Sequence, residues 1–234
     1  MHSTFTTATA LAVIARIAAA QTAPGAVGAT PDVEQGSGPN GSEEWLNTGV
    51  DGDGWAPPFL SQDDVVTISL DDFYANAGTA CQQYDGNFQS AASSVGVRAE
   101  FLAFIAMQES SCDAGEGGPT PGLLQVACEN YPDGSCDNKS VQDNVNAGAQ
   151  VLKNGLDNAG GNIIQALGEY NGWFTGLTQG YPCSSEGQSN GSPQNLDYLQ
   201  QVLNGWFQGE LVYDHVQDFG TYQCSGSCDN GSLC

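Results

Sequence analysis

The sequence predicts a mainly α-helical domain, built around one central buried helix and stapled by disulfide bonds. Apolar residues recur every three or four positions in several stretches, the spacing that gives a helix one apolar face. One stretch, residues 101–107 (FLAFIAM), is apolar throughout, which is typical of a helix covered on all sides. The chain has eight cysteines, an even number that indicates up to four disulfide bonds in a secreted protein.

The predicted helices follow one another along the chain. Their ranges are 69–76, 97–109, 141–156, 163–174 and 196–207. The last is expected to start near Ser192 and Pro193, because serine caps a first helical turn and proline suits its first position. Residues 122–126 (GLLQV) are expected to form a short strand or an extended segment that lines a cleft.

Composition divides the chain into four parts. Residues 1–20 contain a short apolar run that ends in three alanines, the pattern of a secretory signal peptide. A permanent N-terminal helix is the alternative, because the run has no basic residue near its start. Residues 21–60 are expected to form a flexible leader and an N-terminal extension. Residues 61–213 form the predicted folded domain, and residues 214–234 form a cysteine-bearing tail.

Other features of the sequence fit an extracellular protein without a cofactor. Four Asn-x-Ser sequons are typical of a eukaryotic secreted glycoprotein, and they begin at Asn40, Asn138, Asn190 and Asn230. The three cysteines of the tail resemble a stapled loop more than a zinc site, because the chain has only two histidines. No metal ion and no cofactor is therefore expected.

The charge of the chain excludes several classes of partner. Four basic residues stand against 27 acidic ones, a formal net charge of −23. Nucleic acids and anionic membranes bind cationic surfaces, so neither is an expected partner. The acidic surface fits a low-pH working environment or simple solubility. A monomer is expected, because no apolar stripe is left without a helix to cover it.

The same inventory leaves carboxylates as the catalytic groups in supply. His215 is the only histidine beyond the leader, and no catalytic elbow, phosphate-binding loop or dinucleotide-binding loop accompanies it. Glu109 ends the apolar stretch on the stripe that includes Ile105 and Leu102, so its side chain is expected to be buried. Burial raises the pKa of a carboxyl, and a glycosidase needs such a protonated acid as its proton donor. A capping or salt-bridged glutamate is the alternative.

Three motifs in order resemble glycoside hydrolase family 23, which comprises soluble lytic transglycosylase domains, goose-type lysozymes and some chitinases. They are Glu109-Ser110, the segment 122–126, and Tyr170-Asn171 within the sequence EYNG. The family pattern is Glu-Ser at a helix end, a Gly-Leu-Met-Gln segment and an Ala-Tyr-Asn near a later helix. The resemblance covers roughly residues 80–210 and implies a lysozyme-like helical domain, here in a secreted eukaryotic, fungal member.

The resemblance implies a role for each matching residue. Glu109 would be the general acid, and Gln125 would line the sugar cleft. Tyr170 would be the tyrosine whose hydroxyl reaches toward the catalytic carboxyl, with Asn171 beside it in the cleft. A core aromatic at helical spacing is the alternative for Tyr170.

Aromatic residues near these motifs are candidates for stacking on sugar rings, since pyranoses present apolar faces. The candidates are Tyr131 and Trp173, with Phe174 next to the latter. A core position is the alternative for Trp173, and an exposed loop position is the alternative for Tyr131.

A second carboxylate would decide the chemistry. An inverting hydrolase needs a base about 6.5–9.5 Å from the acid, whereas lytic transglycosylases need none, because the sugar's own 6-hydroxyl attacks. Goose-type lysozymes carry one aspartate nine residues before the motif glutamine and another two after it. Glu116 holds the first position here and Ala127 the second, so Glu116 is the candidate base. Asp113, Glu129 and Asp133 are near enough in sequence to replace it.

The resemblance predicts a secreted muramidase that hydrolyses the β-1,4 bond between N-acetylmuramic acid and N-acetylglucosamine, with Glu109 as acid and Glu116 orienting water. Its expected partner is peptidoglycan or a chitin-like polysaccharide. The alternatives are a lytic transglycosylase that forms 1,6-anhydro ends, a chitinase, and a non-catalytic secreted glycan-binding protein. The joint presence of Glu109, Gln125 and Tyr170 argues against the last.

Overall fold

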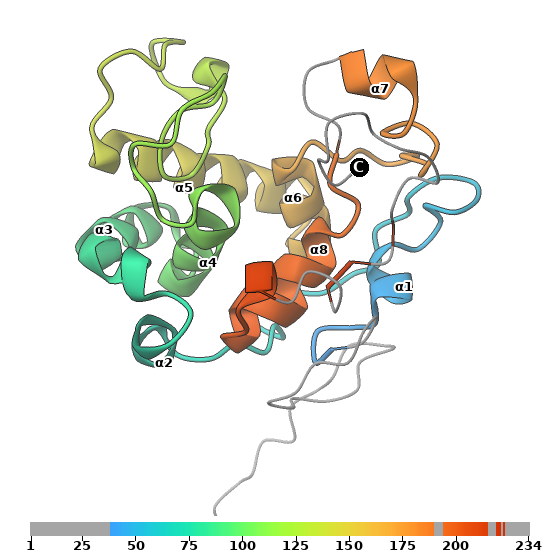
Figure 1. The fold of residues 1–234 in the computed structure, drawn as a ribbon, viewed down its shortest axis with the longest axis horizontal. Helices are drawn as coiled ribbons and strands as arrows, with labels where there is room; N and C mark the ends of the chain where they lie inside the picture. Colours follow the sequence, from blue (N-terminus) through green and yellow to red (C-terminus); the bar gives the residue numbers. More distant parts are fainter. Residues whose placement is uncertain (1–37, 190–193, 215–218, 221, 223–234) are drawn as a thin grey trace, which may run out of the picture.

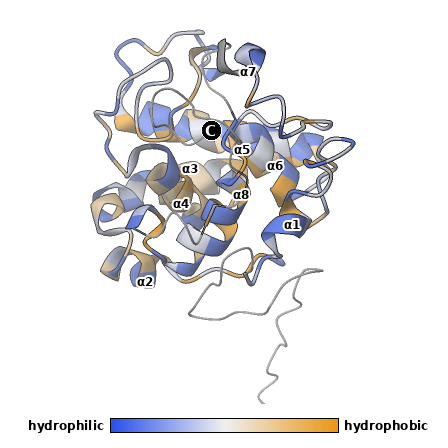
Figure 2. Ribbon diagram, turned by 45° about the vertical axis from the view of Figure 1, so that its right-hand side comes forward, coloured by the Kyte–Doolittle hydropathy of each residue, from blue (hydrophilic) through white to orange (hydrophobic). Residues whose placement is uncertain are grey.

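The computed structural model describes residues 38–189, 194–214, 219–220 and 222, and this part of the chain is mainly helical. The helices surround α4 (Ala99–Ser110), which lies among them in both views (Figures 1 and 2). No β-strand occurs among the described residues, where Ser61 and Asn162 form one isolated bridge. The prediction of a mainly α domain is confirmed.

Short helices precede and follow the long ones. Before α4 lie α1 (Glu43–Leu46), α2 (Leu70–Ala75), the 3-10 helix η1 (Thr79–Tyr84) and α3 (Asp85–Val95). After it lie the 3-10 turn η2 (Cys128–Asn130), α5 (Val141–Asn158), α6 (Ile163–Tyr170), α7 (Ser185–Ser189) and α8 (Tyr198–Gln200). The last helix continues as a π-helical segment η3 (Gln201–Gly205) and a 3-10 turn η4 (Trp206–Gln208), and η5 (Val212–Asp214) follows.

The centre of the fold is α4. Its residues 101–106 have no exposed surface, in agreement with their continuous apolar sequence. Helices α3 and α5 and the segments η3 and η4 pack around it. At its C-terminal end, Ser111 and Cys112 both adopt left-handed backbone conformations, with φ of 53° and 58°. A left-handed backbone cannot continue a right-handed helix, so α4 ends here and the chain turns sharply. Residues other than glycine rarely adopt this conformation.

An aromatic cluster joins α4 to the helices on either side of it. The ring centroid of Phe104 lies 4.7 Å from that of Phe73 in α2 and 4.7 Å from that of Phe207 in η4. Phe101 stacks on the same Phe207 ring at 5.1 Å. All four rings are fully buried, so the cluster ties α2 and η4 to the central helix.

Caps set the limits of the next two helices. Ser140 and Asp143 form a capping box at the start of α5, and Asn162 caps α6. The predicted range 163–174 was too long, because α6 ends at Tyr170. Gly172 follows with φ of 81°, and the Trp173 N–H bonds back to the Gly168 carbonyl, which closes the helix.

The last predicted helix also differs from expectation at its start. Leu196 and Asp197 form a turn, and α8 begins at Tyr198. The proposed cap at Ser192 and Pro193 lies outside the described residues. The pair η1 and α3 was not predicted, because α3 buries only Phe88 and two alanines and its apolar pattern is weak.

The predicted N-terminal extension is part of the domain from residue 38 onward. Leu46, Val50 and Trp55 are buried in the core, and the Trp55 indole donates to the Leu46 carbonyl at 3.0 Å. The expectation of a flexible leader over residues 21–44 is therefore wrong for residues 38–44, most of which are buried, and the extension that follows completes the core. The predicted signal peptide lies outside the described residues.

Two disulfide bonds bracket the long loop after α4. Cys81 pairs with Cys112, which joins η1 to the end of α4, and Cys128 pairs with Cys136. Cys183 is disulfide-bonded as well. The prediction of disulfide-stapled loops is confirmed for this part of the chain. Within the described ranges, none of the helices combines the length and the apolar character that a membrane crossing requires.

Phe104→Ala should destabilise the domain by about 3–5 kcal/mol, because it empties the centre of the aromatic cluster. Phe59→Ala is the matched control, since 60% of the Phe59 side chain is exposed and its loss should change the free energy of unfolding by under about 1 kcal/mol. Urea unfolding followed by circular dichroism measures both. Equal losses for the two variants would contradict the assigned core.

Candidate active site

The three sequence motifs meet at the C-terminal end of α4. The Ser110 hydroxyl donates to the Leu123 carbonyl at 2.7 Å, and the Tyr170 hydroxyl donates to the Leu124 carbonyl at 2.8 Å. The Leu124 N–H donates to the Asn144 side-chain carbonyl in α5 at 2.7 Å. A turn of two buried leucines is thus held by one polar group from each of α4, α5 and α6, and motifs that are far apart in sequence become neighbours.

Glycines allow this close approach. Gly122, which opens the turn, has φ of 107°, and a Cβ there would lie 2.8 Å from the Asn144 amide nitrogen. Gly148 in α5 faces the turn, and a Cβ there would lie 3.0 Å from the Tyr170 hydroxyl and 2.5 Å from a Leu124 methyl. Residues 122–126 form a turn and an extended stretch rather than a strand, because their backbone groups bond to side chains of the helices and not to another strand.

Glu109 is the candidate acid of this site. Its side chain is half-buried, and its Oε1 accepts a hydrogen bond from the Tyr198 hydroxyl at 2.7 Å. Desolvation by burial raises the pKa of Glu109 to about 7, and the hydrogen bond from Tyr198 acts in the opposite direction. A neutral phenol lowers the pKa of a carboxyl less than a cation would, so burial prevails.

No cation pairs with Glu109 in the described part of the chain. The basic residues there form ion pairs elsewhere, Arg98 with Glu100 at 2.6 Å and Lys139 with Asp133 at 2.6 Å. The third pair joins Lys153 and Asp157 within α5. The alternative of a salt-bridged glutamate therefore has no support among the residues that the structure describes.

Three tyrosines surround the carboxyl. The pKa values of Tyr170, Tyr198 and Tyr213 are all raised. Burial is the larger cause, and the negative charge of the nearby Glu109 is the second. The Tyr213 hydroxyl donates to the Gln108 carbonyl, and its half-exposed ring lies edge-on to Trp206 at 5.1 Å. These hydroxyls stay neutral at any pH at which the protein would work, so they act as hydrogen-bond donors and not as bases.

The hydrogen bond to Glu109 comes from a different tyrosine than expected. The resemblance assigned it to Tyr170, but the Tyr170 hydroxyl is directed to the Leu124 carbonyl. Tyr198, 28 positions later, donates to the carboxyl instead. Tyr170 remains close enough to interact electrostatically with Glu109. It therefore positions the turn, while Tyr198 contacts the acid.

The side chains of Gln125 and Asn171 are held by their own loops. The Gln125 amide accepts from the Thr120 hydroxyl at 3.2 Å and donates to the Gly122 carbonyl at 2.8 Å. The side-chain oxygen of Asn171 accepts a hydrogen bond from the Asn195 main-chain N–H at 3.1 Å. Both side chains are partly exposed. Neither hydrogen-bonds to Glu109 in the described residues, so their place in a sugar cleft stays a prediction.

Two predicted sugar-stacking residues belong to the core. Trp173 is 2% exposed, lies edge-on to Trp55 at 4.9 Å and donates its indole N–H to the Asn195 carbonyl. Tyr131 is 4% exposed, and its hydroxyl accepts from the Asn144 amide at 2.7 Å. Trp173 is therefore a core residue and not a stacking platform, and Tyr131 is likewise buried, with its edge on a cavity that does not include Glu109. Phe174, 44% exposed, does present its ring to solvent.

The candidate base Glu116 lies in the exposed loop that the two disulfides bracket. It lines a cavity of about 230 Å³ together with residues such as Lys139 and Asn144, and Glu109 is not among the lining residues. No second carboxylate contributes to the pKa shift of Glu109 in the described residues. Of the other candidates, Asp133 is paired with Lys139, and Asp113 and Glu129 are exposed.

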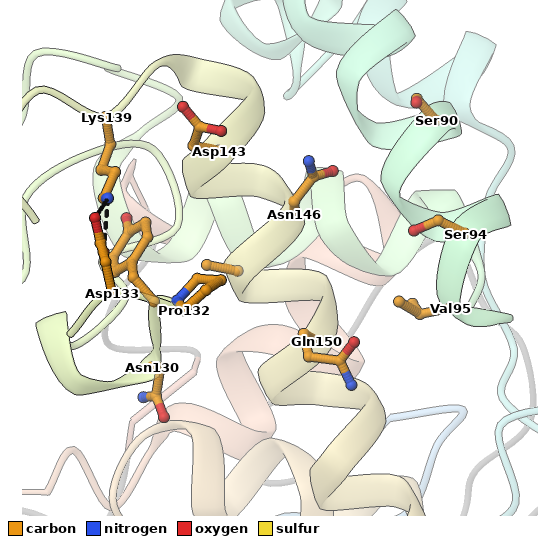
Figure 3. A pocket seen from close by; sticks show the side chains of 12 residues that line it. Ser90, Ser94, Val95, Asn130, Pro132, Asp133, Lys139, Asp143, Asn146 and Gln150 are labelled. Atoms are coloured by element: carbon orange, nitrogen blue, oxygen red, sulfur yellow. Dashed lines mark hydrogen bonds and ion pairs between the residues drawn. The ribbon is translucent and has the colours of Figure 1, made fainter. Parts of the chain in front are cut away.

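A second cavity also lacks Glu109 among its lining residues. It measures about 710 Å³ and is enclosed by α3, α5 and the loop that carries Pro132 (Figure 3). Hydroxyl and amide groups line it, among them Ser90, Asn146 and Gln150, and the Lys139–Asp133 pair closes one side. A large cavity without the buried acid does not by itself indicate catalysis.

Sequence reasoning missed an amide network beside the acid. The Trp206 indole donates to the Gln108 side chain at 2.6 Å, and Gln108 donates in turn to Gln201 at 3.0 Å. Asn195 donates to the same Gln201 oxygen at 2.8 Å. Gln201 is 2% exposed and opens the π-helical segment η3. The signal in the sequence was a glutamine pair, Gln200-Gln201, inside an otherwise apolar stretch.

No protein-family model matches the chain, and no curated protein matches it significantly. The resemblance to glycoside hydrolase family 23 therefore depends on the three motifs and on the way they meet in space.

Glu109 should make stability depend on pH. A carboxyl whose folded-state pKa of about 7 exceeds its ordinary value of 4.5 stabilises the fold below pH 4.5, and this contribution is lost as the pH rises through 7. The loss is about 3 kcal/mol by linkage. Glu109→Gln, which cannot ionise, should gain stability relative to the unmodified protein by about that amount between about pH 4 and about pH 8.

Urea unfolding of both proteins across this pH range measures the difference. Glu116→Gln serves as the matched control, because Glu116 is exposed and its substitution should leave the pH dependence unchanged. A difference between Glu109→Gln and the unmodified protein that stays constant with pH would show that Glu109 titrates normally.

Proposed function

We propose that the protein is a secreted muramidase that cleaves the β-1,4 bond between N-acetylmuramic acid and N-acetylglucosamine in peptidoglycan, with Glu109 as the proton donor. The observation that carries the proposal is a desolvated carboxyl with a pKa of about 7 and no cationic partner in the described residues. Such a group is protonated at mildly acidic pH and can give its proton to a leaving oxygen. The meeting of the three family motifs around it supports the same conclusion.

The surroundings of Glu109 suit a change of charge during the reaction. In the resting site the carboxyl is held neutral by burial. When it gives its proton to the glycosidic oxygen, the carboxylate that forms keeps the hydrogen bond from Tyr198, which stabilises the charged form. The rigid turn held by Ser110 and Tyr170 keeps the neighbouring backbone in place, so little reorganisation is required.

The overall charge of the chain favours action at low pH. A formal net charge of −23 gives no attraction to an anionic bacterial wall at neutral pH. Protonation of surface carboxylates and of Glu109 both favour activity as the pH falls. Disulfide bonds are compatible with an extracellular location. A chitin-like polymer of N-acetylglucosamine is the alternative substrate.

A second candidate function is lytic transglycosylase activity. The observation that favours it is the position of Glu116 in an exposed loop beside a separate cavity, with no second carboxylate acting on Glu109 in the described residues. In this reaction Glu109 gives its proton to the glycosidic oxygen as the bond from that oxygen to C1 breaks, and the 6-hydroxyl of the same sugar attacks C1 and returns its proton to the Glu109 carboxylate. Glu109 would then act as acid and as base, and Glu116 would have no catalytic role.

Glu109→Gln should lower the release of soluble fragments from purified peptidoglycan by at least about a hundredfold, because the amide cannot donate the proton. The variant should remain folded, since glutamine can still accept the hydrogen bond from Tyr198. Turbidity loss at about pH 5 measures the rate, and full activity of this variant would exclude Glu109 as the acid.

Mass spectrometry of the products, with Glu116→Gln alongside, distinguishes the two candidate functions. Reducing N-acetylmuramic acid ends together with a slow Glu116→Gln variant indicate hydrolysis with Glu116 as the base. Fragments lighter by one water, formed equally fast by Glu116→Gln, indicate 1,6-anhydro ends and the transglycosylase. Binding to the wall with no soluble products would instead indicate a glycan-binding protein.

Tyr198→Phe should raise the pKa of Glu109, because it removes the hydrogen bond that lowers this pKa. The alkaline limb of the kcat/KM profile should move up by about one pH unit while the maximal rate falls. Tyr170→Phe is the control, because the Tyr170 hydroxyl bonds to Leu124 and its loss should leave the limb in place. A downward shift in Tyr198→Phe would contradict the proposed contact.

A further inference from the structure

Two of the four N-glycosylation sequons lie in the described residues, and they have opposite environments. Asn40 begins the sequence Asn-Gly-Ser and Asn138 begins Asn-Lys-Ser. Asn40 is 1% exposed, whereas Asn138 is exposed. A glycan adds a bulky, hydrated group to the side-chain amide, so only a surface asparagine can carry one in a folded protein.

The amide of Asn40 is fully used inside the fold. Its Nδ2 donates to the Val66 carbonyl at 2.9 Å and to the Leu203 carbonyl at 2.6 Å, and its Oδ1 accepts from the Val66 N–H at 2.8 Å. Its own N–H donates to the Asn204 side chain at 3.0 Å. A sugar on Nδ2 would replace one of the two donated hydrogens and would need space that the buried side chain does not have.

The amide of Asn138 is available. The residue sits in a turn with φ of 55°, a left-handed conformation that asparagine tolerates well, and its side chain makes no hydrogen bond with the described residues. The Cys128–Cys136 disulfide fixes the chain on one side, and the capping box of Ser140 and Asp143 fixes it on the other. The turn thus presents Asn138 outward from a rigid loop.

We propose that Asn138 carries an N-linked glycan in the secreted protein and that Asn40 does not. In the transfer step, the Asn138 Nδ2 forms a bond to C1 of the first sugar of a lipid-pyrophosphate-linked oligosaccharide. The bond from C1 to the pyrophosphate oxygen breaks, the lipid pyrophosphate leaves with the electron pair, and the amide loses one proton. This requires passage through a eukaryotic secretory pathway and does not depend on glycosidase activity.

The glycan would stand next to the large cavity between α3 and α5. Lys139, which follows Asn138 in the chain, lines that cavity and pairs with Asp133. A glycan on Asn40 would break the hydrogen bond from the Asn40 side chain to the Leu203 carbonyl, which joins this part of the chain to η3. The two sequons therefore differ in consequence as well as in access, because one lies on a surface loop and the other joins two parts of the core.

The test is site-resolved mapping of the full chain secreted from yeast. Enzymatic removal of N-glycans in heavy-oxygen water converts each glycosylated asparagine into a labelled aspartate, which peptide mass spectrometry locates. We expect a label at Asn138 and none at Asn40 in the folded, secreted fraction. A label at Asn40, or an unlabelled Asn138, would overturn the proposal.

Two variants provide the controls. Asn138→Asp, which tolerates the same left-handed backbone, should remove the label and the glycan mass at this position. Asn40→Asp should leave the glycan map unchanged and lower secreted yield severalfold, because it removes the two donated hydrogen bonds. A fall in glycan content with normal yield in Asn40→Asp would also overturn the proposal.

Discussion

The domain depends on the burial of α4. Six consecutive residues of this helix, 101–106, have no exposed surface, and each large apolar side chain stabilises the fold by about 1.5–3 kcal/mol when buried. A helix that is apolar on all sides must be covered on all sides, so α3, α5 and the segments η3 and η4 surround it. Polar side chains are left to its two ends, Glu100 in the first turn and residues 108–110 at the C-terminal end, where the candidate active site lies.

The turn at Leu123 and Leu124 connects this helix end to the rest of the fold. Its leucine side chains are buried while its backbone polar groups bond to Ser110, Asn144 and Tyr170. Buried backbone groups need such partners, because each unpaired one costs free energy comparable to a lost hydrogen bond. The same contacts therefore satisfy the backbone and hold the surroundings of Glu109 in one geometry.

Composition and chemistry are linked through Glu109. A chain with four basic and 27 acidic residues has few cations to spare, and the three in the described part pair with surface acids. The Glu109 carboxyl accepts its hydrogen bond from a tyrosine hydroxyl instead. Because a phenol offsets less of the desolvation than a guanidinium would, the pKa of Glu109 remains near 7. Because no described cation is near Glu109 to lower its pKa, its carboxyl can stay protonated and act as a proton donor.

The sequence by itself determined the helical class, the burial of α4 and the choice of Glu109 as the candidate acid, because these follow from local spacing and from the chemistry of single residues. Only the tertiary structure decided that Tyr198 and not Tyr170 contacts Glu109, and that Trp173 is a core residue. Contacts between distant residues depend on how helices pack and where they end, and local spacing carries no information about either.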